Sequence, residues 1–179
     1  DKYTTKSYTR MSNKPNGDFQ LVDAGVLLAL LVVLVWAPRP WGYFFVIASA
    51  LALRRRILWL SKVPKYVVYA LLVYATAFVL DYISVGPQKT DKAWWEVVVL
   101  APLAEEVVFR ALPMSRLPPP LGWVFAVFIF GALHPQNPLL ASLYGLALAL
   151  AYLGGGYPAS AALHAFNNAL WLYLGTSLF

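Results

Sequence analysis

Long apolar runs, separated by prolines, glycines and charged residues, fill this chain from residue 21 to its end. The runs form seven segments: Leu21–Ala37, Trp41–Leu53, Tyr66–Gly86, Trp94–Leu112, Leu121–Leu133, Leu139–Leu153 and Pro158–Leu174. A helix of about 20 apolar residues crosses the hydrocarbon core of a bilayer. The segments therefore predict an all-α polytopic membrane protein with about seven transmembrane helices. The second, fifth and sixth segments are short enough to be tilted or only partly spanning.

The composition agrees with a bilayer as solvent. Of the 179 residues, 60% are hydrophobic and 12% are charged, whereas soluble domains carry about 25% charged residues. The chain has no cysteine, which excludes disulfides, thiolate zinc sites and cysteine nucleophiles. Its basic residues are not interleaved with aromatic residues, so we expect the lipid bilayer, and no nucleic acid, as a partner.

The positions of the basic residues predict domain organisation and orientation. Residues 1–20 form a polar tail that is not expected to be a signal peptide, with Met11 as an alternative start, and residues 21–179 form one transmembrane domain. Basic residues cluster in this tail and again after the second segment, at Arg54, Arg55, Arg56, Lys62 and Lys65. The positive-inside rule then predicts an integral cell-membrane protein with a cytoplasmic N-terminus. Seven crossings would place the C-terminus outside.

Three charged residues lie within six positions of the fourth segment: Glu105, Glu106 and Arg110. A charged side chain at the centre of a membrane helix costs roughly 2.5–3.5 kcal/mol, so these groups are expected to be paired or to face a wet cavity. Glu106 and Arg110 are four residues apart and share a helix face, which favours an ion pair. Glu105 points about 100° away and stays free for chemistry. The alternative is a purely structural ion pair with a spare glutamate.

Both histidines of the chain also belong to apolar segments. His134 ends the fifth segment, and His164 lies in the seventh, four residues before Asn168 and on the same helix face. Asn167 is rotated away from that face, and for it we expect a hydrogen bond to another helix.

Small residues recur at four-residue spacing along the sixth segment, at Ala141, Gly145 and Ala149. Such a stripe allows two membrane helices to approach closely. An ordinary alanine-rich helix explains the same pattern, and the sequence alone leaves both interpretations open.

Three motifs in order resemble those of the CPBP family, which comprises the type II CAAX prenyl proteases and their prokaryotic relatives. They are Glu105-Glu106-Val-Val-Phe-Arg110, Phe130-Gly-Ala-Leu-His134 and His164-Ala-Phe-Asn-Asn168. The resemblance covers residues 94–174, which would be the catalytic core. It implies a prokaryotic source and a conical active-site cavity formed by the C-terminal four helices.

The resemblance also implies the roles of these residues in peptide hydrolysis. Glu105 and His134 would activate a water molecule, while His164 and Asn168 would stabilise the oxyanion. Glu106 and Arg110 would orient the helix and tune the charge. The implied substrate is a prenylated or other lipid-associated peptide, cut near its C-terminus.

Zinc is the alternative chemistry, because Glu105, His134 and His164 could hold a catalytic zinc ion with a water in the open position. No His-Glu-x-x-His or His-x-x-x-His pattern is present. We therefore expect a glutamate-type protease without a cofactor.

Other functions use the same residue types. Relatives linked to bacteriocin processing and self-immunity suggest those roles, and a non-catalytic membrane scaffold could keep the motifs for stability. Buried Glu, His and Arg also build the proton relays of transporters, but the chain is small and lacks paired inverted halves.

His134 raises a question of depth. It comes about 20 Å along the fifth helix, whereas Glu105 and His164 are expected near the middle of the bilayer. We therefore predict that the turn Pro135–Pro138 lies inside the protein, where irregular backbone can line a cavity.

Overall fold

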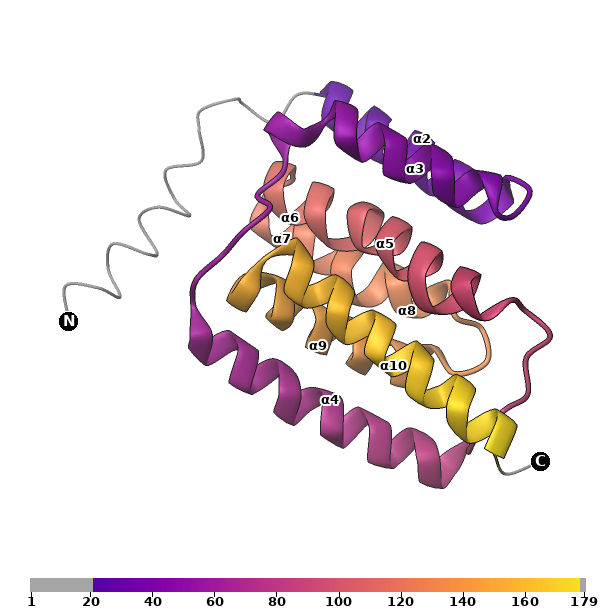
Figure 1. Ribbon diagram of the computed structural model, residues 1–179. Coiled ribbons are helices and arrows are strands. Elements are labelled where there is room, and N and C mark those ends of the chain that lie inside the picture. The colour runs from indigo at the N-terminus through magenta and orange to yellow at the C-terminus, as the bar shows by residue number, and fades with distance from the viewer. Residues whose placement is uncertain (1–20, 178–179) are drawn as a thin grey trace.

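A computed structural model describes residues 21–177 of the chain, in which helical stretches run back and forth between two ends (Figure 1). Five stretches are simple helices: α2 (Leu21–Trp36), α3 (Trp41–Ala52), α4 (Pro64–Ser84), α9 (Pro138–Gly155) and α10 (Tyr157–Ser177). A 3-10 turn, η1 (Arg54–Arg56), follows α3. The all-α prediction is confirmed for this part of the chain, and the predicted polar tail, residues 1–20, lies outside it.

The fourth and fifth stretches are continuous helices that switch between α and π geometry. The fourth contains η2 (Glu96–Leu100), α5 (Ala101–Glu106), η3 (Val107–Ala111) and α6 (Leu112–Arg116). The fifth contains α7 (Pro119–Trp123), η4 (Val124–Ile129) and α8 (Phe130–Ala132). With these joined, each predicted apolar segment corresponds to one helical stretch.

The two π segments of the fourth stretch have a cause in the sequence. The segment η2 ends two residues before Pro102, and η3 ends two residues before Pro113. Proline inside a helix lacks a donor and clashes with the carbonyl four residues earlier. Widening the preceding turn relieves this conflict, and π segments are often found at functional sites.

The helix α4 shows the clearest adaptation to lipid. Two helices of the described chain, α4 and α9, are long and apolar enough to cross a membrane. Only 11% of the apolar window of α4 is buried, against 56% for α9, and α4 exposes large apolar side chains such as Val68, Leu72 and Ile83. A core helix of a soluble protein would be mostly buried, so this exterior suits a bilayer. How many of the other stretches span the membrane stays a prediction.

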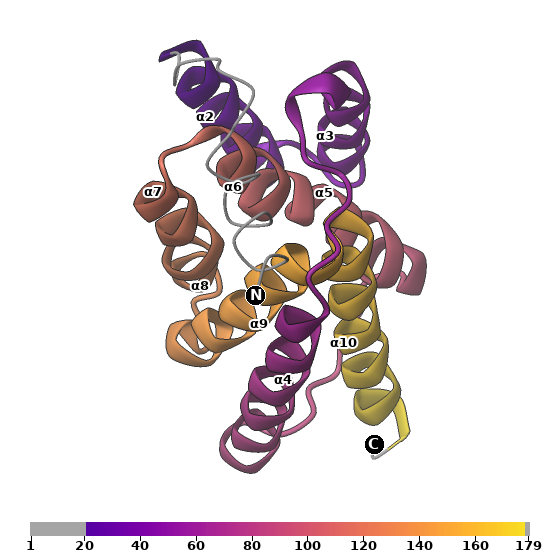
Figure 2. The same ribbon diagram turned by 90° about the vertical axis from the view of Figure 1, so that its left-hand side faces the viewer.

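The fourth stretch lies at the centre of the bundle (Figure 2). The α2–α3 hairpin packs on one side of it, and α10 packs on another. The helix α4 packs along α9 and lies at the edge of the bundle away from the α2–α3 hairpin. The central position of the fourth stretch explains why its charged residues are buried.

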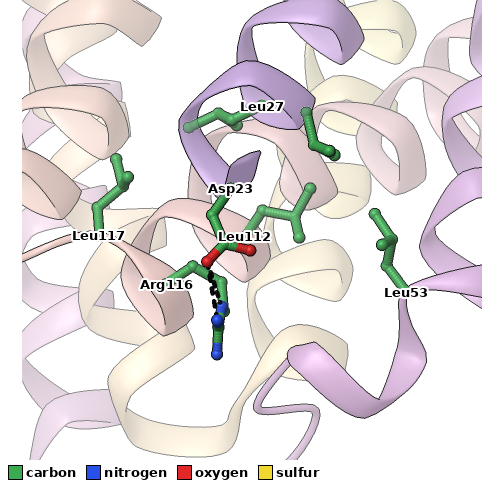
Figure 3. A pocket seen from close by; sticks show the side chains of 7 residues that line it. Asp23, Leu27, Leu53, Leu112, Arg116 and Leu117 are labelled. Atoms are coloured by element: carbon green, nitrogen blue, oxygen red, sulfur yellow. Dashed lines mark hydrogen bonds and ion pairs between the residues drawn. The ribbon is translucent and has the colours of Figure 1, made fainter. Parts of the chain in front are cut away.

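An ion pair ties the first helix to the fourth stretch (Figure 3). An Nη atom of Arg116 lies 2.8 Å from Oδ2 of Asp23, and Nε of Arg116 donates to the same oxygen over 3.2 Å. Leu27, Leu112 and Leu117 surround the pair. This contact fixes α2 against α6 at the end of the bundle where α2 begins.

The two ends of the bundle carry different basic residues. The turn η1 and the beginning of α4 lie at the end where α2 starts, whereas the turn between α2 and α3 and the loop before η2 lie at the other end (Figure 1). The first end therefore holds Arg54, Arg55 and Lys65. The second end holds Arg39 and Lys92. This arrangement supports the predicted orientation, which itself stays a prediction.

The small-residue stripe of α9 faces neighbouring helices. Ala141 and Ala149 are buried, and a Cβ atom added at Gly145 would lie 2.8 Å from the carbonyl oxygen of Ala126 and 3.2 Å from the Cα of Val127. No Cβ fits so close to backbone atoms. The small-residue stripe thus lets α9 approach η4 closely, which is the first of the two interpretations that the sequence left open.

Replacing Gly145 by alanine is expected to destabilise the protein by about 1–3 kcal/mol, because the added methyl group overpacks against backbone that cannot turn aside. The measurement is the apparent free energy of unfolding in detergent. Gly25→Ala is the matched control, since a Cβ at Gly25 would meet nothing within 4 Å. Equal stability of the two variants would contradict the close contact.

Candidate active site

A fully buried ion pair forms the base of the site. Nη1 of Arg110 lies 2.8 Å from Oε1 of Glu106, and both side chains have no exposed surface. The predicted pairing at four-residue spacing is thus observed. The guanidinium also donates to the carbonyl of Ala126 over 3.1 Å and lies 4.1 Å from the ring centre of Phe130.

Two side chains of α10 bind the same carboxylate. The Oγ of Ser160 donates to Oε2 of Glu106 in a short hydrogen bond, and Nδ1 of His164 lies 2.8 Å from Oε1 of Glu106. Because a carboxylate next to Arg110 accepts hydrogen bonds, Nδ1 carries a proton. This interaction fixes the imidazole ring and turns its Nε2 away from Glu106.

Ser160 was missed by the sequence analysis, although a signal was present. It lies four residues before His164, which lies four residues before Asn168. All three therefore share one face of α10. A hydroxyl on the face that carries the site residues was a candidate for holding one of them.

Glu105 stands apart from the buried network. Its Oε2 lies 3.8 Å from Nε2 of His164, and its side chain keeps 18% of its surface exposed. One carboxylate is therefore fixed among buried partners, while its neighbour in the sequence faces the free nitrogen of the histidine. Helical spacing predicted this difference between Glu106, which is paired with Arg110, and Glu105, which is not. The catalytic roles of both residues stay predictions.

His134 folds back along the end of α8. Its Nδ1 lies 2.7 Å from the carbonyl oxygen of Phe130, and the two ring centres are 4.4 Å apart. The ring of Phe130 in turn lies 5.9 Å from that of His164, edge to face. With Nδ1 donating to a carbonyl, Nε2 of His134 is an acceptor available to the site.

We expected the turn after His134 to lie inside the protein and to line a cavity; it does line a cavity, through Gln136 and Asn137, but it is not buried. Pro135, Gln136 and Pro138 are exposed, at the end of the bundle that also carries the loop before η2. His134 reaches inward through the backward fold of its side chain instead. The meeting of His134 with Glu105 stays a prediction.

A cavity of about 540 Å³ lies beside these groups. His134, His164 and Asn168 line it, whereas Glu105 is not among the lining residues. Its walls come from η2, α8, α9 and α10, and also from α4 and the loop that follows α4. The resemblance implied a cavity formed by the C-terminal four helices; the residues that line this cavity also include residues of α4.

Asn168 is held by the fourth stretch and not by His164. Its Nδ2 donates to the carbonyl of Val97 over 2.9 Å. In the π register of η2, the donor for this carbonyl would come from Pro102, which has no N–H. The carbonyl is therefore available to Asn168, and one Nδ2–H of Asn168 remains for another acceptor.

Asn167 does not form the interhelical hydrogen bond that we expected. Its Nδ2 lies 3.4 Å from Oδ1 of Asn168 on the same helix, and both residues line the cavity. Oδ1 of Asn167 is buried without a partner in the described part of the chain. Asn167 thus supports the orientation of Asn168 from within α10.

The zinc alternative depends on how close Glu105, His134 and His164 lie to one another. Among residues 21–177, no three His, Asp or Glu side chains come close enough together to share a metal ion. Nδ1 of each histidine contacts an oxygen, of Glu106 for His164 and of the Phe130 carbonyl for His134, which leaves Nε2 of both rings for a proton or a ligand. The expectation of a protease without a cofactor and the zinc alternative both stay predictions.

Comparison with known protein families gives a match to part of the chain. Residues 87–170 match the family model described as type II CAAX prenyl endopeptidase Rce1-like. No curated protein and no solved structure gives a significant match. The matched residues include every polar site residue predicted from the sequence: Glu105, Glu106, Arg110, His134, His164 and Asn168.

Proposed function

Because the chain belongs to the CPBP family through its Rce1-like residues 87–170, we propose that it is an intramembrane glutamate-type endopeptidase. One observation carries the proposal. The buried Glu106 fixes His164 so that its free nitrogen faces Glu105, beside a cavity large enough for a peptide segment. A structural ion pair alone would not need a second carboxylate at that nitrogen.

The reaction starts with a water molecule placed between Glu105 and Nε2 of His134. These groups remove a proton from the water as its oxygen attacks the carbonyl carbon of the peptide, which makes a tetrahedral oxyanion. The proton then passes to the leaving nitrogen, the C–N bond breaks, and a carboxylic acid and an amine are released. No covalent enzyme intermediate is formed.

His164 and Asn168 are positioned to stabilise the oxyanion. The unused Nδ2–H of Asn168 is one donor, and Nε2–H of a protonated His164 is the other. Donors that are fixed by Glu106 and by the Val97 carbonyl need not reorganise during the reaction.

The proposed substrate is a membrane-associated, CAAX-type peptide with a lipid group near its C-terminus. The apolar exterior of the bundle supports delivery from the bilayer, and the cavity lies next to the lipid-exposed helix α4. We further propose a cytoplasmic N-terminus and an external C-terminus. No observation favours the scaffold, immunity or transporter alternatives.

Incubation of the purified protein with a farnesylated CAAX peptide tests the proposal, with release of the C-terminal tripeptide measured by mass spectrometry. We expect cleavage of the prenylated peptide and little cleavage of its unprenylated counterpart. A chelator is expected to leave the rate unchanged. Cleavage of neither prenylated peptides nor other lipidated or bacteriocin-type peptides would contradict the proposal and favour a scaffold.

A further inference from the structure

We propose that Asp81 binds a cationic side chain, lysine or arginine, of the peptide substrate a few residues from the bond that is cut. The inference rests on the proposed function, because it assigns a specificity subsite in the same cavity. It starts from a carboxylate that the proposed reaction does not use.

Asp81 is a membrane-helix carboxylate without a cation. It lies in the last turn of α4, one of two helices among the described residues that are long and apolar enough to cross a membrane. Its side-chain partner is the hydroxyl of Tyr144, which donates to Oδ2 over 3.1 Å, and no Lys, Arg or His of residues 21–177 forms an ion pair with it. Charged residues in membrane helices are costly and mostly serve a function with a partner.

The carboxylate faces the active-site cavity. Asp81, Tyr144 and Trp171 line this cavity together with His134, His164 and Asn168. They come from three helices, α4, α9 and α10, which pack side by side (Figure 2). A group bound by Asp81 would therefore share one space with a peptide at the catalytic residues.

Hydrogen bonds hold the carboxylate in place. Nε1 of Trp171 lies 3.4 Å from the hydroxyl of Tyr144, which in turn donates to Asp81. Both hydrogen bonds, from Trp171 to Tyr144 and from Tyr144 to Asp81, donate in the direction of the carboxylate and support its negative charge. The side chain is thus preorganised as an acceptor, which reduces the entropic cost of binding a ligand.

Aromatic rings complete a site suited to a cation. The ring of Trp171 lies 5.2 Å from that of Phe78, and Tyr144 lies 5.9 Å from Tyr74. Faces of tryptophan and tyrosine attract ammonium and guanidinium groups. A carboxylate in a cavity wall that also holds Tyr74, Tyr144 and Trp171 would favour a lysine or arginine side chain over an apolar one.

The position of the subsite follows from α10. Trp171 is three residues beyond Asn168, which places it about 4.5 Å further along the helix axis. An extended peptide advances about 3.3 Å per residue. With the additional reach to Asp81, the cationic residue is expected within about four residues of the scissile bond.

A substrate scan with charge reversal tests the inference. Prenylated peptides carry lysine, norleucine or glutamate at each position within four residues of the cut, except at the prenylated cysteine, and kcat/KM is measured for each. For the wild type, we expect one position where lysine is preferred over norleucine by about 10- to 100-fold, the range of a hydrogen bond to a charged group. Asp81→Asn is expected to abolish this preference, and Asp81→Lys is expected to prefer glutamate there.

Controls separate binding from structure. Asparagine can still accept the hydrogen bond of Tyr144, so Asp81→Asn should keep the thermal stability of the wild type. A purely structural role would change kcat/KM equally for lysine and norleucine peptides. Asp91→Asn, which removes another carboxylate from the cavity wall, is the matched control and should keep the lysine preference.

The outcomes distinguish the two proposals. Cleavage by the wild type without a cation preference at any position contradicts the subsite alone, as does a preference that survives in Asp81→Asn. If the wild type cleaves no peptide of the scan, the proposed function is contradicted and the subsite with it. The charge-reversal variant keeps the test decisive even where Asp81→Asn is unstable.

Discussion

Glu105→Gln is expected to lower kcat by about 10²- to 10⁴-fold, the usual contribution of a positioned general base. Glutamine keeps the size and the hydrogen-bonding oxygen of the side chain but cannot take a proton from water. The variant should fold normally, because Glu105 lies outside the buried network and is partly exposed. The measurement is single-turnover cleavage of the prenylated peptide, together with thermal unfolding in detergent.

Glu96→Gln is the matched control for this prediction. It removes the charge of another glutamate in the same helical stretch, one that lies 4.0 Å from Arg39 and away from His164. We expect a rate within about twofold of the wild type, since the energy of partly exposed pairs is small. If Glu105→Gln retained full activity, the general base would have to be a different group.

Arg110→Met is expected to reduce the free energy of unfolding by about 3–5 kcal/mol, because it leaves the carboxylate of Glu106 buried without its cation. The pair is fully buried and 2.8 Å apart, so solvent cannot compensate for the loss. The measurement is unfolding by SDS titration from mild detergent. Arg39→Met is the matched control, because its side chain is half exposed and its pair is long, with an expected loss of at most about 1 kcal/mol.

The double variant Glu106→Leu/Arg110→Met separates stability from catalysis. Replacing both partners of a buried pair by apolar side chains is often neutral or stabilising, so we expect most of the lost stability to return. Activity should not return, because His164 loses the carboxylate that holds its ring. A double variant that is both stable and active would show that the pair has no role in the reaction.

The helical stretches could be predicted from the sequence because their boundaries are set locally. The predicted ends beside Pro38 and Pro138 agree with the structure, whereas the fourth stretch runs to Arg116, beyond its predicted end at Leu112. The π segments were not predicted, although Pro102 and Pro113 were visible. A proline within a helix can be relieved by a kink, a break or a wider turn, and the surrounding packing decides among these.

The site could be predicted in part. Four-residue spacing identified the pair of Glu106 with Arg110 and the shared face of His164 and Asn168. It did not show that these last two are fixed by different partners on the fourth stretch, Glu106 for the histidine and the carbonyl of Val97 for the asparagine. Those contacts depend on how α10 lies against the fourth stretch, which spacing within one helix does not contain.

The sequence by itself determined that apolar helices would carry two glutamates, an arginine and two histidines, and it determined which of them share a helix face. Both results follow from the 3.6-residue period of the helix and the cost of charge in an apolar medium. The tertiary structure alone decided that Ser160 and His164 fix Glu106, and that α4 brings Asp81 into the cavity wall. These features depend on interhelical packing, such as the close approach at Gly145, and packing joins residues that are far apart in the chain.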